Sequence, residues 1–140
     1  MRAPARFLAY GLVGLATELG FTAAARGRPS TSPWMLPVYG LAQPLFEPAH
    51  ERLRRRSVPL RAATYGLGFA AVEYASGRAL RRVRGAAPWD YAHARLNLDG
   101  LVRADYVPLW AAYGLLLERV HDAFARNRRT SVTDPRGNFP

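Results

Sequence analysis

Two short motifs in this 140-residue chain combine side chains that bind metal ions in helical proteins. Glu47-Pro-Ala-His50 and Glu118-Arg-Val-His121 each place a histidine three residues after a glutamate, which puts both side chains on one face of a helix. Two more glutamates, Glu18 and Glu73, stand in segments that are otherwise apolar. A lone Glu from two helices, with Glu-x-x-His from two others, is the ligand set of di-metal carboxylate four-helix bundles.

The predicted metal site therefore has six ligands, which are Glu18, Glu47, His50, Glu73, Glu118 and His121. Four carboxylates would offset the charge of two divalent cations, and this oxygen-rich set with two imidazoles suits iron or manganese. A structural network is the alternative. In it Glu18 and Glu73 are protonated and hydrogen-bonded or paired with an arginine such as Arg61, and His50 and His121 lie at the interface beside arginine-rich loops. Both interpretations stay open, and no catalytic residue is assigned.

The four glutamates require four helices, and the apolar segments predict them at about residues 5–26, 34–52, 59–82 and 104–124. A helix that is apolar all round is buried or lies in lipid, and four such helices leave too little chain to cover them. We therefore predict an all-α, four-helix transmembrane bundle over residues 1–125, followed by a polar, disordered tail over residues 126–140. A soluble helical core is the alternative, because the uninterrupted apolar runs are short.

The chain contains an apparent internal repeat. Arg6, Tyr10, Gly11 and Glu18 match Arg61, Tyr65, Gly66 and Glu73 at one fixed offset, and Pro37, Glu47 and His50 match Pro108, Glu118 and His121 at another. The pattern predicts duplication of a two-helix unit, with both copies entering the bilayer in the same direction. The glycines beside these positions would permit close contact between helices.

The charge is strongly positive, with 20 arginines, no lysine and a formal net charge of +10. Such a chain could bind nucleic acid, but its arginines cluster at segment ends, as in residues 52–56 and 78–84, which favours the lipid bilayer as partner over nucleic acid. The absence of cysteine excludes disulfides and thiolate metal sites. By the positive-inside rule both termini and the 52–61 loop are cytoplasmic, although the arginine-rich 78–103 loop opposes this orientation.

Several motifs also resemble the integral membrane protein family named "Putative ABC-transporter type IV", also called CmpB-like. They are Trp34-Met-Leu-Pro37-Val-Tyr39-Gly40, Leu45-Phe46-Glu47-Pro48-Ala-His50, Glu73-Tyr74-Ala-Ser-Gly77, Pro88-Trp89-Asp90-Tyr91, Asn97-Leu98-Asp-Gly100 and Pro108-Leu109-Trp110. The resemblance covers residues 6–121 and implies a multi-pass protein of the bacterial cytoplasmic membrane that works as a permease with a separate ATPase subunit. It supplies no site residues, and a permease this small would form a homo-oligomer.

Three functions follow as hypotheses. The first is a permease-like transport component of unknown substrate, which needs an ATPase partner because the chain has no phosphate-binding Gly-Lys-Ser loop. The second is a membrane-embedded di-metal carboxylate enzyme that acts on a lipid-soluble substrate. The third is a structural or accessory membrane subunit.

Overall fold

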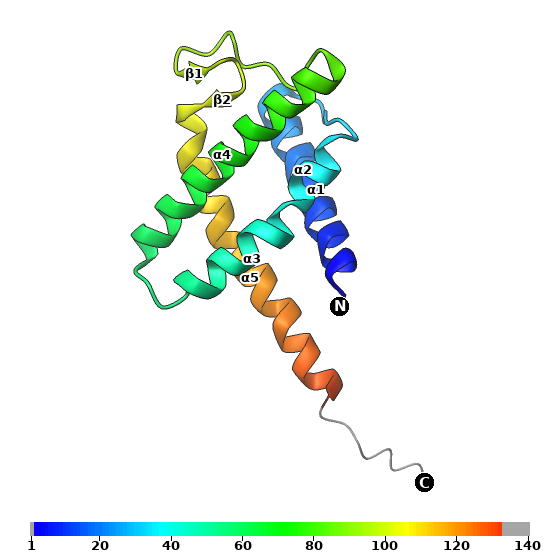
Figure 1. The fold of residues 1–140 in the computed structure, drawn as a ribbon, viewed down its shortest axis with the longest axis vertical. Helices are drawn as coiled ribbons and strands as arrows, with labels where there is room; N and C mark the ends of the chain where they lie inside the picture. Colours follow the sequence, from blue (N-terminus) through cyan, green and yellow to red (C-terminus); the bar gives the residue numbers. More distant parts are fainter. Residues whose placement is uncertain (1, 133–140) are drawn as a thin grey trace.

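Helices form nearly all of the structure, a computed structural model that describes residues 2–132 (Figure 1). Residue 1, residues 133–140 and the side chains of residues 124 and 127–132 lie outside this description. The helices are α1 (Ala3–Arg26), α2 (Met35–Gly40), α3 (Ala42–Leu53), α4 (Val58–Arg84), the short 3-10 helix η1 (Ala104–Tyr106) and α5 (Val107–Val132). The prediction of an all-α class is confirmed.

The segment predicted as one helix over residues 34–52 is two helices in the structure. The break falls at Leu41, whose N–H donates to the carbonyl of Pro37 (3.1 Å). Pro44 has no N–H to donate to the carbonyl of Gly40, so the regular helical ladder is interrupted at this point. As a result α3 turns away from α2 and runs across the molecule toward the start of α4 (Figure 1).

The last helix is longer than predicted. It begins at Val107 and continues to Val132, so residues 126–132, predicted as part of a disordered tail, are helical. The rest of that predicted tail, residues 133–140, lies outside the described residues.

The loop between α4 and α5 contains a small antiparallel hairpin that the sequence analysis did not predict. Strand β1 (Asn97–Leu98) pairs with β2 (Val102–Arg103). Asp99 (φ 55°) and Gly100 (φ 65°) both adopt left-handed conformations, for which an Asp-Gly pair is well suited. The hairpin packs on α4 through Leu101, which is fully buried; a side chain at Gly77 would clash with it.

The helices pack in two pairs. Helix α1 packs mainly on α2, and α4 packs mainly on α5. Between the pairs lies a small core, made of Tyr10, Ala42, Phe46, Tyr65, Tyr113 and Leu117. Much of this core is aromatic, and its rings stack or meet edge to face around Phe46.

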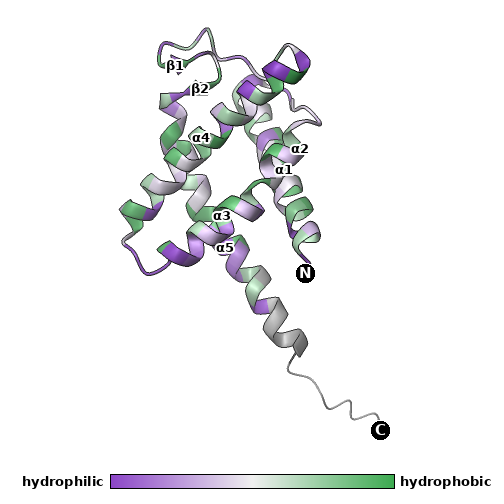
Figure 2. Ribbon diagram, in the orientation of Figure 1, coloured by the Kyte–Doolittle hydropathy of each residue, from purple (hydrophilic) through white to green (hydrophobic). Residues whose placement is uncertain are grey.

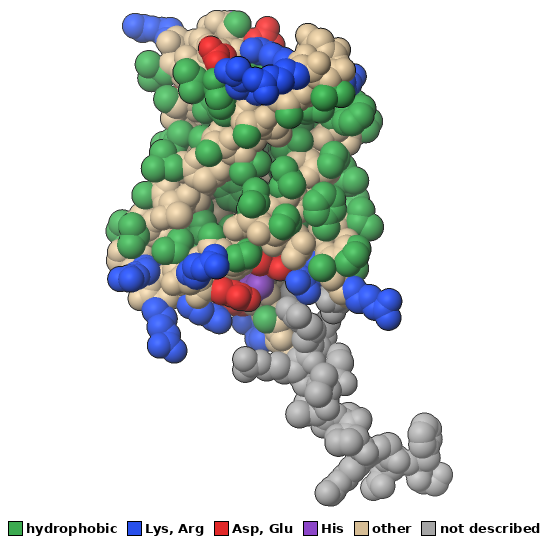
Figure 3. Space-filling view, viewed as in Figure 1, with side chains coloured by type: hydrophobic (Ala, Val, Ile, Leu, Met, Phe, Trp, Pro, Cys, Tyr) green, Lys and Arg blue, Asp and Glu red, His purple; other side chains and the backbone are tan. Residues whose placement is uncertain are grey.

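Large apolar side chains are exposed in the middle of the long helices. Leu12 of α1 is 60 % exposed, Leu67 of α4 is 64 % exposed and Leu116 of α5 is 52 % exposed. Hydrophilic residues concentrate at helix ends and in loops (Figure 2). On the face seen in Figure 3, arginine side chains gather at the two ends of the molecule and hydrophobic side chains form a belt between them.

Among the described residues, α1 is the one helix whose length and apolar composition suffice to cross a membrane. Buried core helices and N-terminal signal sequences share these properties. The long helices α4 and α5 contain more charged side chains. Whether these helices are compatible with a membrane therefore depends on how those charges are paired.

Candidate functional site

The first cluster of polar side chains surrounds Glu47 on α3. The Arg6 guanidinium of α1 donates from Nε to both carboxylate oxygens of Glu47, at 3.0 and 3.2 Å. Nδ1 of His121, on α5, lies 3.6 Å from the same carboxylate and 3.3 Å from the hydroxyl of Tyr10. Gln43 donates a further hydrogen bond to Glu47 at 3.1 Å. The carboxylate is thus buried with a cation and several donors around it.

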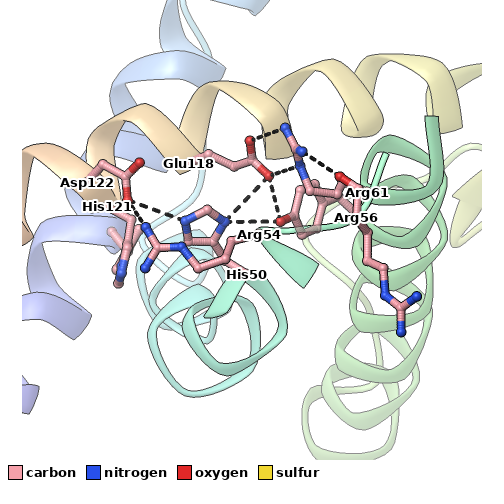
Figure 4. A network of polar contacts seen from close by, with 9 residues as sticks. His50, Arg54, Arg56, Arg61, Glu118, His121 and Asp122 are labelled. Carbon is pink, nitrogen blue, oxygen red and sulfur yellow. Dashed lines mark hydrogen bonds and ion pairs between the residues drawn. The ribbon is translucent and has the colours of Figure 1, made fainter. Parts of the chain in front are cut away.

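The second cluster surrounds Glu118 on α5 and is drawn in Figure 4. Arg61 of α4 donates from Nε (2.8 Å) and Nη2 (3.1 Å) to the two carboxylate oxygens, which is a bidentate ion pair. Tyr65 donates its hydroxyl to Glu118 at 2.8 Å, and Nδ1 of His50 lies 3.4 Å from Glu118 and 3.2 Å from the Tyr65 hydroxyl. Arg61 also donates to the carbonyl of Arg56, which anchors the loop before α4.

These two clusters use matched positions of the repeated motifs. In the first cluster α1 supplies the arginine and the tyrosine and α3 the glutamate; in the second, α4 supplies the arginine and the tyrosine and α5 the glutamate. The histidine of each cluster comes from the helix that carries the glutamate of the other cluster. His50 and His121 meet edge to face at the centre, with ring centroids 5.1 Å apart. We call the whole assembly the Arg–Glu network; its members are Arg6, Tyr10, Glu47, His50, Arg61, Tyr65, Glu118 and His121.

The paired helices approach each other closely at Gly11 and at Gly66. A Cβ atom at Gly11 would lie 2.8 Å from the carbonyl oxygen of Leu36, and one at Gly66 would lie 2.8 Å from the carbonyl oxygen of Val107. The predicted role of these glycines in close helix contact is therefore confirmed. This close contact packs α1 against α2 and α4 against α5.

One part of the Arg–Glu network departs from this symmetry. Asp122 lies 3.4 Å from Nε2 of His50 and 3.6 Å from the Arg54 guanidinium (Figure 4). In the part of the chain that the structure describes, His50, His121 and Asp122 are the one group of three metal-binding side chains whose ligand atoms lie within 4.8 Å of one another. Asp122 was not among the predicted ligands.

The remaining two predicted ligands lie in a different part of the molecule. Glu18 and Glu73 line one cavity of about 320 Å³ beside the hairpin loop. Glu73 is 8 % exposed and accepts hydrogen bonds from the Tyr91 hydroxyl (3.1 Å) and the Trp110 indole (3.3 Å). Glu18 accepts a hydrogen bond from Thr31 at 2.7 Å. Burial raises the pKa of the Tyr91 phenol, with the nearby Glu73 adding to the effect, so Tyr91 keeps its proton and donates it.

Glu18 and Glu73 differ from the other glutamates in their charge balance. Among the described residues, neither has an arginine or histidine nitrogen within ion-pair distance, whereas Glu47 and Glu118 each have an arginine and a histidine. Arg61, which the sequence analysis offered as a partner for Glu18 or Glu73, is paired with Glu118 instead.

The structure therefore divides the six predicted ligands between two places. Glu47, His50, Glu118 and His121 come together in the Arg–Glu network, while Glu18 and Glu73 line the cavity near the hairpin. Whether any of them binds a metal ion is untested and stays a prediction. The arginine pairing that was predicted for Glu18 and Glu73 is found instead at Glu47 and Glu118.

Several residues of these sites were not assigned to a site from the sequence. Arg6, Tyr10 and Tyr65 were recognised as repeated positions but given no role, although a polar residue repeated inside an apolar segment is itself a signal. Tyr91 and Trp110 gave no such signal, because only the fold of the loop and of α5 brings them to Glu73.

A family model described as "Putative ABC-transporter type IV" matches residues 5–138. The chain belongs to this family. The match includes both groups of glutamates, so the Arg–Glu network and the Glu18–Glu73 cavity are features of a member of this family. No solved structure matches the chain.

Proposed function

We propose that the chain is a multi-pass membrane component of a transporter, in which α1, α2 with α3, α4 and α5 cross the bilayer. The observation that carries the proposal is the belt of exposed apolar side chains between two arginine-rich ends (Figure 3). In water, exposed leucines at mid-helix positions such as Leu12 and Leu67 would be unfavourable, whereas in lipid they are the expected surface. The 24, 27 and 26 residues of α1, α4 and α5 are long enough for a hydrocarbon core about 30 Å thick.

The charged residues inside these helices are compatible with this location. A charge within the membrane is tolerated when it faces the bundle interior and is paired. Arg6 with Glu47, and Arg61 with Glu118, meet this condition, since their side chains are between 9 and 18 % exposed.

The repeat gives the transporter component a specific architecture. We infer that the chain is a duplicated two-helix unit, supported by the matched contacts of Arg6 and Arg61 and by the matched glycines Gly11 and Gly66. The N-terminus and the loop between α3 and α4 lie at the same end of the molecule (Figure 1), which is the cytoplasmic end in this proposal.

The family description supports a role in ATP-driven transport. Because the sequence lacks a phosphate-binding Gly-Lys-Ser loop, the ATPase would be a separate subunit. The small size of the chain favours a homo-oligomer in the complete transporter.

The absence of cysteine allows a direct test of membrane topology. Single cysteines are introduced by Arg55→Cys in the α3–α4 loop, Arg95→Cys in the hairpin loop and Leu67→Cys in the apolar belt; all three positions are exposed. In intact cells, a membrane-impermeant maleimide should label Arg95→Cys only, and Arg55→Cys should react once the membrane is permeabilised. Leu67→Cys should stay unlabelled until the protein is unfolded. Rapid labelling of Leu67→Cys in folded protein would disprove membrane insertion.

A metal-dependent function is a second candidate, favoured by the approach of His50, His121 and Asp122. Two imidazoles and a carboxylate are a frequent ligand set for catalytic transition metals. Metal content is measured by mass spectrometry on protein purified from cells supplied with iron, manganese and zinc. One ion per chain that is lost in Asp122→Asn would support a single-metal site, and two ions lost in Glu73→Gln would support the six-ligand site. Metal-free protein under all three conditions would exclude this function.

A further inference from the structure

Two cavities adjoin each other and differ in character. The first, of about 300 Å³, lies between α2, α3, α4 and α5 and is lined almost entirely by apolar side chains such as Leu45, Phe69 and Val72. The second, of about 320 Å³, is the cavity that contains Glu18 and Glu73. Glu73 lines both cavities. Each volume is in the range of small-molecule sites, and together they offer an apolar compartment directly beside a polar one.

The apolar cavity opens within the hydrophobic belt. In Figure 3, hydrophobic side chains surround a recess at the centre of the face. Gly68 lines this cavity, and a Cβ atom at Gly68 would meet no atom within 4 Å, so there is room for a larger side chain at this position. In the membrane orientation proposed above, a lipid-soluble molecule could enter from the side without crossing an aqueous phase.

The polar cavity has the charge and the aromatic lining that bind an ammonium group. Its charged lining residues are Glu18, Glu73 and Asp90 against a single Arg26, so acidic side chains outnumber basic ones although the protein as a whole is strongly basic. Its walls also contain six tyrosine and tryptophan rings, which are Tyr39, Trp89, Tyr91, Tyr106, Trp110 and Tyr113. Aromatic faces combined with carboxylates are the typical recognition elements for alkylammonium cations.

We propose that the two cavities together bind a cationic amphiphile, with its alkyl chain in the apolar cavity and its ammonium head group beside Glu73 and Glu18. This inference rests on the proposed transport function and names the class of substrate. The ligand supplies the positive charge that Glu18 and Glu73 do not receive from the described residues. An anionic head group would be repelled by the carboxylates, and a purely apolar ligand would leave the buried Glu73 beside no cation.

Tryptophan fluorescence offers a direct binding assay. Trp89 and Trp110 line the polar cavity, and Trp34→Phe removes the third tryptophan of the chain. The Trp34→Phe protein is reconstituted in phosphatidylglycerol nanodiscs, which contain no choline head group. It is then titrated with a dodecyltrimethylammonium probe that carries bromine on its chain, because bromine quenches fluorescence on contact. Brominated dodecyl sulfate and brominated dodecanol serve as anionic and neutral probes of equal chain length.

The variants separate head-group recognition from simple partitioning into lipid. In Glu73→Gln the cationic probe should bind about tenfold more weakly, since a charge-assisted contact is replaced by a neutral one. The matched control Glu51→Gln removes an exposed carboxylate outside both cavities and should leave binding unchanged. The neutral and anionic probes should bind weakly to all three proteins.

A second pair of variants tests the chain compartment without changing charge. Gly68→Leu fills the apolar cavity and should abolish quenching by the cationic probe. Gly20→Leu makes the same substitution at an exposed position of α1 where a Cβ atom also meets nothing within 4 Å, and should bind as the parent does. This pair keeps the test decisive if Glu73→Gln does not fold.

The result that would overturn the proposal is equal quenching by the three probes, or cationic quenching that neither Glu73→Gln nor Gly68→Leu weakens. If the cysteine labelling above supports membrane insertion while this binding fails, the substrate class is wrong and the proposed membrane function stands. If Leu67→Cys is labelled in folded protein, the membrane function itself is wrong.

Discussion

The two groups of glutamates differ in the partners that surround their carboxylates. Glu47 and Glu118 are surrounded by an arginine, a tyrosine and a histidine, so their charge is neutralised inside the protein. Glu18 and Glu73 receive hydrogen bonds from neutral donors but, among the described residues, no cation. The sequence separates the two groups only by the histidine that follows Glu47 and Glu118 three residues later, and it assigned all four glutamates to one site.

The difference indicates a division of labour. A charge pair that is complete within the protein has no need of a ligand, and its partners hold the helices in register. A carboxylate that lines a cavity without a cation has a negative charge that the protein does not neutralise, which is typical of a binding site. The Arg–Glu network would therefore contribute mainly to stability, and the Glu18–Glu73 cavity mainly to function.

The largest expected effect comes from breaking one pair of the Arg–Glu network. Arg61→Met removes the cation and leaves Glu118 with a hydroxyl and an imidazole as partners, which should lower the free energy of unfolding by about 3 kcal/mol. Thermal unfolding in detergent micelles measures the change, with Arg55→Met as the control at an exposed position. The double variant Arg61→Met/Glu118→Gln should regain part of the loss, because no unpaired charge remains. A stability equal to that of the parent in Arg61→Met would show that the network is not structural.

A smaller effect is expected from the tyrosine that completes the same cluster. Tyr65→Phe removes the hydroxyl that donates to Glu118 at 2.8 Å, while the ring stays packed against Phe46. The loss should be about 1 kcal/mol, the usual net contribution of one hydrogen bond. The matched variant outside this network is Tyr74→Phe, whose hydroxyl donates to the exposed Asp99, and it should be closer to neutral. If the two variants lose the same stability, burial does not strengthen the Tyr65 contact.

The sequence was sufficient to predict the helical class and most helix boundaries, because the apolar segments are long and their ends carry arginine, proline or glycine. Helix α1 was expected at about residues 5–26 and is Ala3–Arg26; α4 was expected at about 59–82 and is Val58–Arg84. The break at Leu41 was missed even though Pro44 and Pro48 were visible, since proline is tolerated in the first turn of a helix and its effect depends on where that helix begins.

The candidate site was predicted in its residues but not in its arrangement. Helical spacing places Glu47 on the same helix face as His50, and Glu118 on the same face as His121. In the structure, however, His121 contacts Tyr10 and Glu47, and His50 contacts Tyr65 and Glu118. Spacing within one helix cannot predict such an exchange, because it depends on how the two pairs pack. The separation of Glu18 and Glu73 from the other ligands likewise depends on two features that were not predicted. These are the turn of α3 away from α2 and the hairpin in the loop between α4 and α5.

The smallest expected effect on stability is at Glu73, which differs most from the arginine-paired Glu118. Glu73→Gln keeps an oxygen that can accept from Tyr91 and Trp110, and it removes a buried charge that lacks a cation among the described residues. The free energy of unfolding should therefore change by less than about 1 kcal/mol, and a gain is as consistent as a loss. Glu118→Gln, measured in the same micelles, should lose clearly more, since it leaves the Arg61 guanidinium without its carboxylate. Equal losses at Glu73 and Glu118 would mean that both glutamates are structural, and the case for a ligand site beside the hairpin would then depend on the binding assay alone.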